Sequence, residues 1–411
     1  MNVLRGISVT QVSPGIDMPY FNIADPSFAM QSEAVRRARD ESWIAKTNYG
    51  YAVLRHAEVG TLLRNTSLSQ GSAQWPEHHG VHSGSFYQWW SKNLLVLEGT
   101  EHTRIRRLLN PAFSPARARK LKADFQVLAN ELVASIVERG SIEFVNDFAA
   151  PFATRALCIM LGLPEEHWQF IADRADTIGL ALSVNINEEI QQIDTAVDEL
   201  YEFVETLIQE RRENPVDDVI STLVTKSSTD SDSLSPEELR NAIVLMLFGG
   251  MDTTRNQLGL AIQTFMHNPQ EWEKLAADPT LVDRALEEVL RVNPTTRWVT
   301  REAVEDFEFN GVHFEKGTTV HLFTASSGTD IEAFPNPEID ISEKDRKAHF
   351  TFGGGKHQCI GQHIAKADMS VALATLAAAM TDIQLDGADE WLPDSGNTGP
   401  VRLPIRFTKR S

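Results

Sequence analysis

The chain has 411 residues, of which 42% are hydrophobic and 23% charged, and its 38 basic and 57 acidic side chains give a formal net charge of −19. This composition is globular and excludes a disordered or collagen-like chain. The acidic balance argues against nucleic acid as the main partner, because phosphate binding needs a net basic face. The two cysteines, Cys158 and Cys359, lie far apart and imply no disulfide framework. No apolar run approaches the ~20 residues that span a bilayer, so we expect a cytoplasmic protein without a membrane segment.

Helical patterns dominate the sequence between residues 114 and 380. One predicted helix begins at Pro115, and a second amphipathic segment covers residues 190–212. The longest predicted helix follows Ser235, a capping residue with proline next to it and glutamate three residues on, and it runs to His267. Because Asn-Pro follows His267, the helix is expected to end there.

Strand patterns are sparser and gather near residues 307–323. Residues 307–309 and 312–314 flank an Asn-Gly pair, which is typical of a β-hairpin turn, and residues 317–323 continue the strand character. We therefore predict a mainly α-helical fold with a minor β region. Residues 1–411 are expected to form a single domain without a fused reductase domain.

Glycines surround Cys359 in the segment Phe352-Gly-Gly-Gly-Lys-His-Gln-Cys-Ile-Gly361. Glycines let the backbone approach a flat group closely and expose N–H groups that can hydrogen-bond a sulfur anion. A helix is predicted from Gly361 to Met380, so the cysteine lies just before a helix N-terminus, where a thiolate is favoured. A buried structural cysteine beside a phosphate-type glycine loop is the alternative interpretation.

The whole ten-residue segment resembles the haem-binding loop of the cytochrome P-450 superfamily, and Ala365, six residues past the cysteine, also matches that family. The resemblance implies a single haem-binding domain with haem b as cofactor and Cys359 as the axial ligand of its iron. Thiolate ligation favours cleavage of the O–O bond. By the same resemblance His357 contacts a haem propionate, Phe352 packs near the sulfur, and Gly361 belongs to the cofactor-binding loop.

A second motif, Gly249-Gly-Met-Asp252-Thr253-Thr254, lies inside the longest predicted helix. Each glycine costs a helix interior ~1 kcal/mol relative to alanine, so the pair needs an explanation. A hydrogen bond from the Thr253 hydroxyl to the Gly249 carbonyl would open the helix and leave a notch suited to oxygen binding and proton delivery. Close helix packing is the alternative. The motif resembles the family's oxygen-activation motif, which implies that Asp252 and Thr253 are catalytic.

Two further motifs occur in the family's order along the chain. Glu288 and Arg291, three residues apart on a predicted helix, resemble the family's structural glutamate-x-x-arginine pair, with an exposed ion pair as the alternative. The family's usual third partner of this pair is not recognisable in the segment before the cysteine loop. His102 and Arg106, at positions i and i+4, could reach one anion or form a solvated basic face. The resemblance makes them propionate partners together with Arg301.

Substrate contacts are predicted less directly. An aromatic loop contains Trp75, Phe86, Trp89 and Trp90, and by resemblance it covers the substrate pocket, although its rings could equally pack the loop onto the body. Arg297 could pair with a substrate carboxylate or carbonyl, or with a haem propionate or a surface group. Further candidates for substrate contact are Leu180, Leu245, Gly249 and Thr398.

Seven basic and no acidic residues fall between residues 102 and 123, and with Lys356 they could form a basic patch near the cysteine. An acidic ferredoxin-type iron–sulfur protein could dock there as electron donor, with an ordinary solvated helix as the alternative. The resulting hypothesis is a monomeric monooxygenase that uses O2 to oxidise a small hydrophobic substrate. A peroxide-dependent peroxygenase and a non-enzymatic haem-based sensor or ligand-binding protein are the alternatives.

Overall fold

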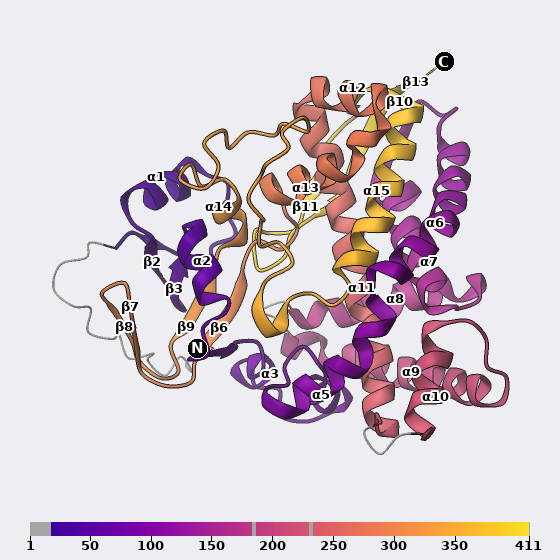
Figure 1. The fold of residues 1–411 in the computed structure, drawn as a ribbon, viewed down its shortest axis with the longest axis horizontal. Coiled ribbons are helices and arrows are strands. Elements are labelled where there is room, and N and C mark those ends of the chain that lie inside the picture. Colours follow the sequence, from indigo (N-terminus) through magenta and orange to yellow (C-terminus); the bar gives the residue numbers. More distant parts are fainter. Residues whose placement is uncertain (1–17, 183–185, 230–232, 411) are drawn as a thin grey trace.

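A large helical body and a smaller β-rich region lie side by side in the molecule (Figure 1). The computed structural model describes residues 18–182, 186–229 and 233–410. Its α-helices are α1 (Glu33–Glu41), α2 (His56–Leu62), α3 (Trp75–His78), α4 (Ser85–Trp90), α5 (Gly99–Leu109), α6 (Pro115–Ile136), α7 (Ala150–Leu161), α8 (Trp168–Gly179), α9 (Ile186–Glu213), α10 (Val219–Thr229), α11 (Pro236–His267), α12 (Pro269–Ala277), α13 (Val282–Val292), α14 (Thr324–Gly328) and α15 (Gln362–Ala379). Its strands are β1 (Tyr20–Phe21), β2 (Ile44–Thr47), β3 (Gly50–Val53), β4 (Leu68–Gln70), β5 (Ser141–Glu143), β6 (Val299–Ala303), β7 (Phe307–Phe309), β8 (Val312–Phe314), β9 (Thr319–Leu322), β10 (Met380–Leu385), β11 (Glu390–Trp391), β12 (Pro400–Arg402) and β13 (Pro404–Lys409).

Helix α11 runs through the helical body and contacts most of the helices around it (Figure 1). The predicted capping box is present, with the Ser235 hydroxyl accepting from the Glu238 N–H and the Glu238 carboxylate accepting from the Ser235 N–H. The helix ends at His267, as predicted. Because α11 is buried along most of its length, groups placed at its middle lie inside the protein.

The other sequence-predicted elements are also present. Helix α6 begins at Pro115 behind the cap Ser114, and α15 covers all but the ends of the predicted residues 361–380. Helix α9 begins four residues before the predicted start at Ile190. In the β7–β8 hairpin Asn310 and Gly311 have φ values of 47° and 78°, the left-handed pair that a tight turn of this type requires. The prediction of a mainly α fold with a minor β region is confirmed.

The β region contains more than the predicted hairpin. Its largest sheet has the order β1-β2-β3-β9-β6-β4, flanked by α1, α2 and α14 (Figure 1). Strand β3 pairs in parallel with β9, about 270 residues further along the chain, with Tyr51 opposite Val320. Strand β6 lies between β9 and β4, and this position brings Arg301 opposite Gln70. The sheet thereby holds one of the predicted cofactor-binding residues beside the segment before α5.

In the described parts of the chain, no helix is both long enough and apolar enough to cross a membrane.

Candidate active site

Cys359 lies at the end of the glycine loop, just before the first turn of α15. The residue is accessible to solvent, yet burial raises the pKa of its thiol. The backbone N–H groups of Gly361 and Gln362 donate hydrogen bonds to the sulfur, and together with the Arg106 charge they oppose that rise in pKa. The predicted interaction between glycine-loop N–H groups and the sulfur is therefore present, at the start of α15.

Two glycines shape the loop that carries this thiol. Gly353 and Gly355 both have φ of 68°, and a Cβ added at Gly355 would lie 2.5 Å from the Leu63 carbonyl oxygen. The Cys359 N–H donates to the Phe352 carbonyl at 2.8 Å, which closes the loop. A side chain at Gly355 would therefore displace the loop from α2 and move the sulfur.

The predicted propionate partners come together from three distant parts of the chain. The His102 and His357 rings lie 4.3 Å apart, and the His357 ring nitrogen lies 3.0 Å from the Glu98 carboxylate. Arg301 donates to the Gln70 side chain at 2.6 Å, and Arg106 donates to the Gln358 carbonyl next to Cys359. Burial lowers the pKa of His357 to about 4 and that of Arg301 to about 10, and in each case the Glu98 charge opposes the effect.

These residues fit a haem with its two carboxylates. The buried Nε2 of His102 has no hydrogen-bond partner among the described residues, and an unsatisfied buried nitrogen is unfavourable. Two guanidinium groups, those of Arg106 and Arg301, lie in the same cluster and are the side chains that best match carboxylates. A propionate placed here would meet cationic donors and one free ring nitrogen, while the thiol supplies a soft ligand for iron.

The middle of α11 carries the predicted notch. The Thr253 hydroxyl donates to the Gly249 carbonyl at 3.3 Å, as predicted from the sequence. A Cβ built on Gly249 would have no heavy atom within 4 Å, and the residue is exposed although α11 is otherwise mostly buried. At Gly250, by contrast, a Cβ would lie 2.9 Å from Leu157, so close packing against α7 explains this second glycine. Gly249 therefore belongs to the notch and Gly250 to a close helix contact, the two explanations that the sequence left open for the pair.

Asp252 is held by an arginine that the sequence analysis did not single out. Its carboxylate pairs with Arg255 and accepts from the Asn256 amide at 3.1 Å. Arg255 also pairs with Asp176 of α8 at 2.8 Å, and that carboxylate is half exposed. Burial raises the pKa of Asp252, and the Arg255 charge opposes that rise. The chain therefore connects an exposed carboxylate to Asp252 through one guanidinium group.

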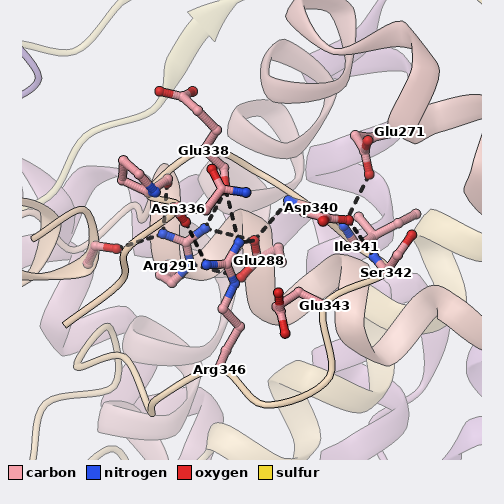
Figure 2. Close-up of polar contacts among 12 residues, drawn as sticks. Glu271, Glu288, Arg291, Asn336, Glu338, Asp340, Ile341, Ser342, Glu343 and Arg346 are labelled. Atoms are coloured by element: carbon pink, nitrogen blue, oxygen red, sulfur yellow. Dashed lines mark hydrogen bonds and ion pairs between the residues drawn. The ribbon is translucent and has the colours of Figure 1, made fainter. Parts of the chain in front are cut away.

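The Glu288–Arg291 pair is buried, so the alternative of an exposed ion pair is wrong. Both side chains are at most 3% exposed, and they form two hydrogen bonds of 2.8 and 2.7 Å (Figure 2). Arg291 also donates to the carbonyls of Gly328, Pro337 and Glu338. The third partner of the pair is Arg346, which reaches the Glu288 carboxylate at 3.2 Å. The segment that departs from the family pattern thus supplies its carbonyl groups and one cation to the same network.

Arg297 does not offer its charge to a substrate, and this corrects one of the predicted contacts. Its guanidinium group pairs with Asp394 at 2.8 Å and donates to Asn293 at 3.1 Å. The side chain is only 7% exposed. An acidic partner already neutralises this arginine, so a substrate carboxylate is not needed to explain it.

Packing also explains most of the aromatic loop. Phe86, Trp89 and Trp90 are at most 1% exposed, so no small molecule touches them without displacing the loop. The Trp89 ring meets Phe248 of α11 at 5.6 Å, and the Trp90 indole donates to the backbone at 2.9 Å. These three residues anchor the loop to the body, and the prediction that they contact substrate is corrected accordingly.

The remaining substrate candidates differ in accessibility. Trp75 is half-buried and donates to the Ala181 carbonyl at 2.8 Å, while Leu180 is 39% exposed on the same short turn. Leu245 is half-buried on α11, one turn before Gly249. Thr398 is 3% exposed and donates its hydroxyl to the Leu392 carbonyl, so its polar group is already satisfied. Trp75, Leu180, Leu245 and Gly249 stay predictions.

The predicted basic patch is largely paired with acidic side chains. Ion pairs join Arg104 to Glu238, Arg117 and Lys120 to Asp217, Lys122 to Asp283, and Lys356 to Glu98. Pairs of this kind lower the positive potential that the surface offers to an acidic partner. The sequence alone could not indicate this, because the acids come from the turn between α9 and α10, from α11 and α13, and from the start of α5.

A second ionic cluster lies beside Phe352. Glu287 meets Lys366 at 2.6 Å and His349 at 3.1 Å, and the Lys366 ammonium lies 5.3 Å from the Phe352 ring centre. Burial alone would raise the pKa of Glu287, but the hydrogen bonds from His349 and Lys366 outweigh it and lower the pKa to about 2. The Glu287 contribution to stability is therefore present above pH 4.5, the ordinary pKa, and is lost as the pH falls toward 2.

We expect the Glu287→Gln variant to melt at a lower temperature than the wild type at pH 7. The difference should shrink as the pH falls from about 5 to about 3, because the unfolded wild-type chain takes up a proton at Glu287 over this range while the folded protein does not. Thermal unfolding followed by circular dichroism over this range measures it. A difference that stays constant with pH would contradict the assignment of this ion-paired state to Glu287.

The chain is similar to known proteins over most of its length. A family model described as Cytochrome P450 matches residues 167–379. Luteothin monooxygenase of Streptomyces thioluteus is 32% identical over 95% of this chain and 96% of its own length. Nocardicin C N-oxygenase of Nocardia uniformis subsp. tsuyamanensis is 29% identical over 90% of this chain and 94% of its own. The crystal structure of myxobacterial cytochrome P450 CYP267B1 in complex with myristic acid superposes with a TM-score of 0.83 at 26% identity, covering 94% of this chain and 98% of the other.

Proposed function

Since the chain belongs to the cytochrome P450 family of haem-thiolate monooxygenases, we propose that it inserts one oxygen atom from O2 into a small hydrophobic organic molecule. The observation that carries this proposal is the notch in α11, where the Thr253 hydroxyl bonds the Gly249 carbonyl beside open space and Asp252 lies next to it. A peroxygenase or a ligand-binding protein would not need this pair, because it has no protons to deliver to oxygen.

The residues of the chain take distinct parts in this proposal. Cys359 holds the iron of haem b, and His102, Arg106, Arg301 and His357 bind the propionates. When bound, the haem supplies cleavage of the O–O bond, which its thiolate ligand favours. Phe352 and Gly361 shape the loop around the sulfur.

Proton delivery falls to Asp252 and Thr253 in this account. Arg255 holds the Asp252 carboxylate at rest, and Asp176 competes for the same guanidinium group. When Arg255 turns toward Asp176, the Asp252 carboxylate is free to take up a proton from solvent and pass it to the Thr253 hydroxyl. As the hydroxyl oxygen receives this proton, the hydroxyl gives up its own proton toward the open space at Gly249. Electrons come from a separate ferredoxin and its reductase, and we propose that they arrive on the side of the molecule that carries Arg106 and the cysteine loop.

The Thr253→Ala variant tests this proposal. It should consume NAD(P)H with surrogate ferredoxin and reductase but release most of the reducing equivalents as hydrogen peroxide, because the hydroxyl that relays the proton is lost. We expect product formed per NAD(P)H to fall about tenfold or more, within the range for loss of a proton-transfer group. The substrate for the assay is the hydrophobic compound that gives the largest spin-state shift in a screen.

Thr254→Ala is the matched control, since Thr254 is the neighbouring threonine and is buried. It should keep product and NAD(P)H consumption coupled. Unchanged coupling in Thr253→Ala would overturn the proton-delivery assignment.

A further inference from the structure

Two segments about 100 residues apart form a short two-stranded structure, which we call the paired wall: residues 295–298 and residues 394–398. The Thr295 hydroxyl donates to the Thr398 carbonyl at 2.7 Å, and the Thr398 N–H donates back to the Thr295 carbonyl at 2.9 Å. The Arg297 N–H donates to the Gly396 carbonyl at 2.8 Å. Between these contacts, Thr296 and Asn397 form an antiparallel bridge.

Arg297 and Asp394 lock the paired wall with side chains. Besides its ion pair with Asp394, Arg297 donates to the Asn293 side chain, which in turn donates to Thr264 of α11 at 3.1 Å. The second oxygen of Asp394 accepts from the Met30 N–H at 2.8 Å. Both side chains are well buried, at 7% and 16% exposure. Ion pairs of this kind fix geometry strongly, because either partner left alone would be a buried unpaired charge.

The paired wall is next to the Thr253 region of α11 at one end and to the strand that carries Arg301 at the other. The Gln257 amide, one helical turn beyond Thr253, accepts from the Thr295 N–H at 2.8 Å and donates to the Asn293 carbonyl at 3.1 Å. Strand β6 begins directly after Trp298 and leads to the propionate partner Arg301 within five residues. The wall therefore runs between the proposed proton-delivery residues and the proposed haem carboxylate site.

We propose that Arg297, through its ion pair with Asp394, is a positioning residue that holds the paired wall as one side of the substrate pocket. It sets the width of the pocket without touching the substrate. A rigid wall selects a hydrophobic molecule by its shape. A change in the shape of the pocket therefore alters the affinity for one molecule relative to that for another. This inference rests on the proposed function of the site.

The test uses two iron-binding probes on the haem-loaded enzyme, imidazole and 4-phenylimidazole, titrated by their Soret shifts. Both bind the iron through nitrogen, but only the second carries a ring that extends toward the pocket walls. In Arg297→Gln and Asp394→Asn, we expect 4-phenylimidazole to bind about tenfold more weakly while imidazole changes less than about twofold. Because the two side chains form one interaction, the double variant should be no worse than the more affected single variant.

Arg174→Gln is the matched control, because Arg174 pairs with Glu199 at 2.7 Å on the α8 and α9 surface. It should leave the ratio of the two affinities unchanged. An unchanged ratio in Arg297→Gln, in protein with a normal carbon-monoxide spectrum, would overturn the inference. If Arg297→Gln fails to load haem, Asp394→Asn and Arg297→Lys are judged by the same ratio. Wild-type protein without the haem-thiolate spectrum would instead refute the proposed function.

Discussion

The Arg291→Ala variant is expected to lose about 3–5 kcal/mol of folding free energy, the usual cost of removing one partner from a buried ion pair. Glu288 would be left as a buried charge with Arg346 as its remaining cationic partner. The carbonyls of Gly328, Pro337 and Glu338 would lose their donor at the same time. The segment that leads into the cysteine loop would then be free to move, so haem content should fall with stability.

Denaturant unfolding and the haem-to-protein ratio measure this effect. Arg346→Ala is the control, because Arg346 is 15% exposed and reaches only one oxygen of Glu288, so its cost should be clearly smaller. Arg291→Lys should remain impaired, since an ammonium group cannot reproduce the forked contacts of the guanidinium. A folding free energy within 1 kcal/mol of the wild type for Arg291→Ala, together with full haem content, would contradict the role assigned to this pair.

The Asp252→Asn variant is expected to turn over about 100-fold more slowly with surrogate redox partners, a typical effect of removing a proton-transfer group. The amide keeps the shape of the side chain and can still face Asn256, but it cannot carry a proton between solvent and Thr253. We therefore expect the solvent deuterium isotope effect on turnover to increase in the variant. Stopped-flow and steady-state rates in H2O and D2O give both quantities.

Asp176→Asn is the matched control for this prediction, because it changes the other carboxylate that holds Arg255. Arg255 would then be held more tightly by Asp252, and turnover should fall moderately, well short of the Asp252→Asn effect. If turnover of Asp252→Asn stayed within twofold of the wild type, Asp252 would not be on the proton path.

Features set by local spacing could be predicted from the sequence. The Thr253–Gly249 hydrogen bond, the Glu288–Arg291 pair and the position of Cys359 before α15 each depend on residues within one helical turn or one short loop. The geometry of a single helical turn or short loop determines these contacts, independently of the fold of the rest of the chain. Arg255 could also have been found, because it lies three residues after Asp252 on the same helix.

Contacts between distant segments could not be predicted in this way. Arg346 lies 58 residues beyond Glu288 in an irregular segment, and the pairing of β3 with β9 joins segments about 270 residues apart. Arg297 was expected to pair with a substrate, a propionate or a surface group, because nothing in its neighbourhood indicates Asp394, 97 residues away. The aromatic loop gave two equally good interpretations, and only burial in the folded chain decided between them.

The central claim is that Cys359 holds the haem iron as a thiolate, and the carbon-monoxide difference spectrum of the reduced protein tests it most directly. We predict the strongly red-shifted Soret band that characterises thiolate ligation in the wild type. The band should be lost in Cys359→Ser and kept in Cys158→Ser, whose sulfur is buried and has its pKa raised to about 12 by that burial. An unshifted band in folded, haem-loaded wild-type protein would mean that a neutral thiol or a histidine holds the iron, and the monooxygenase account would be contradicted.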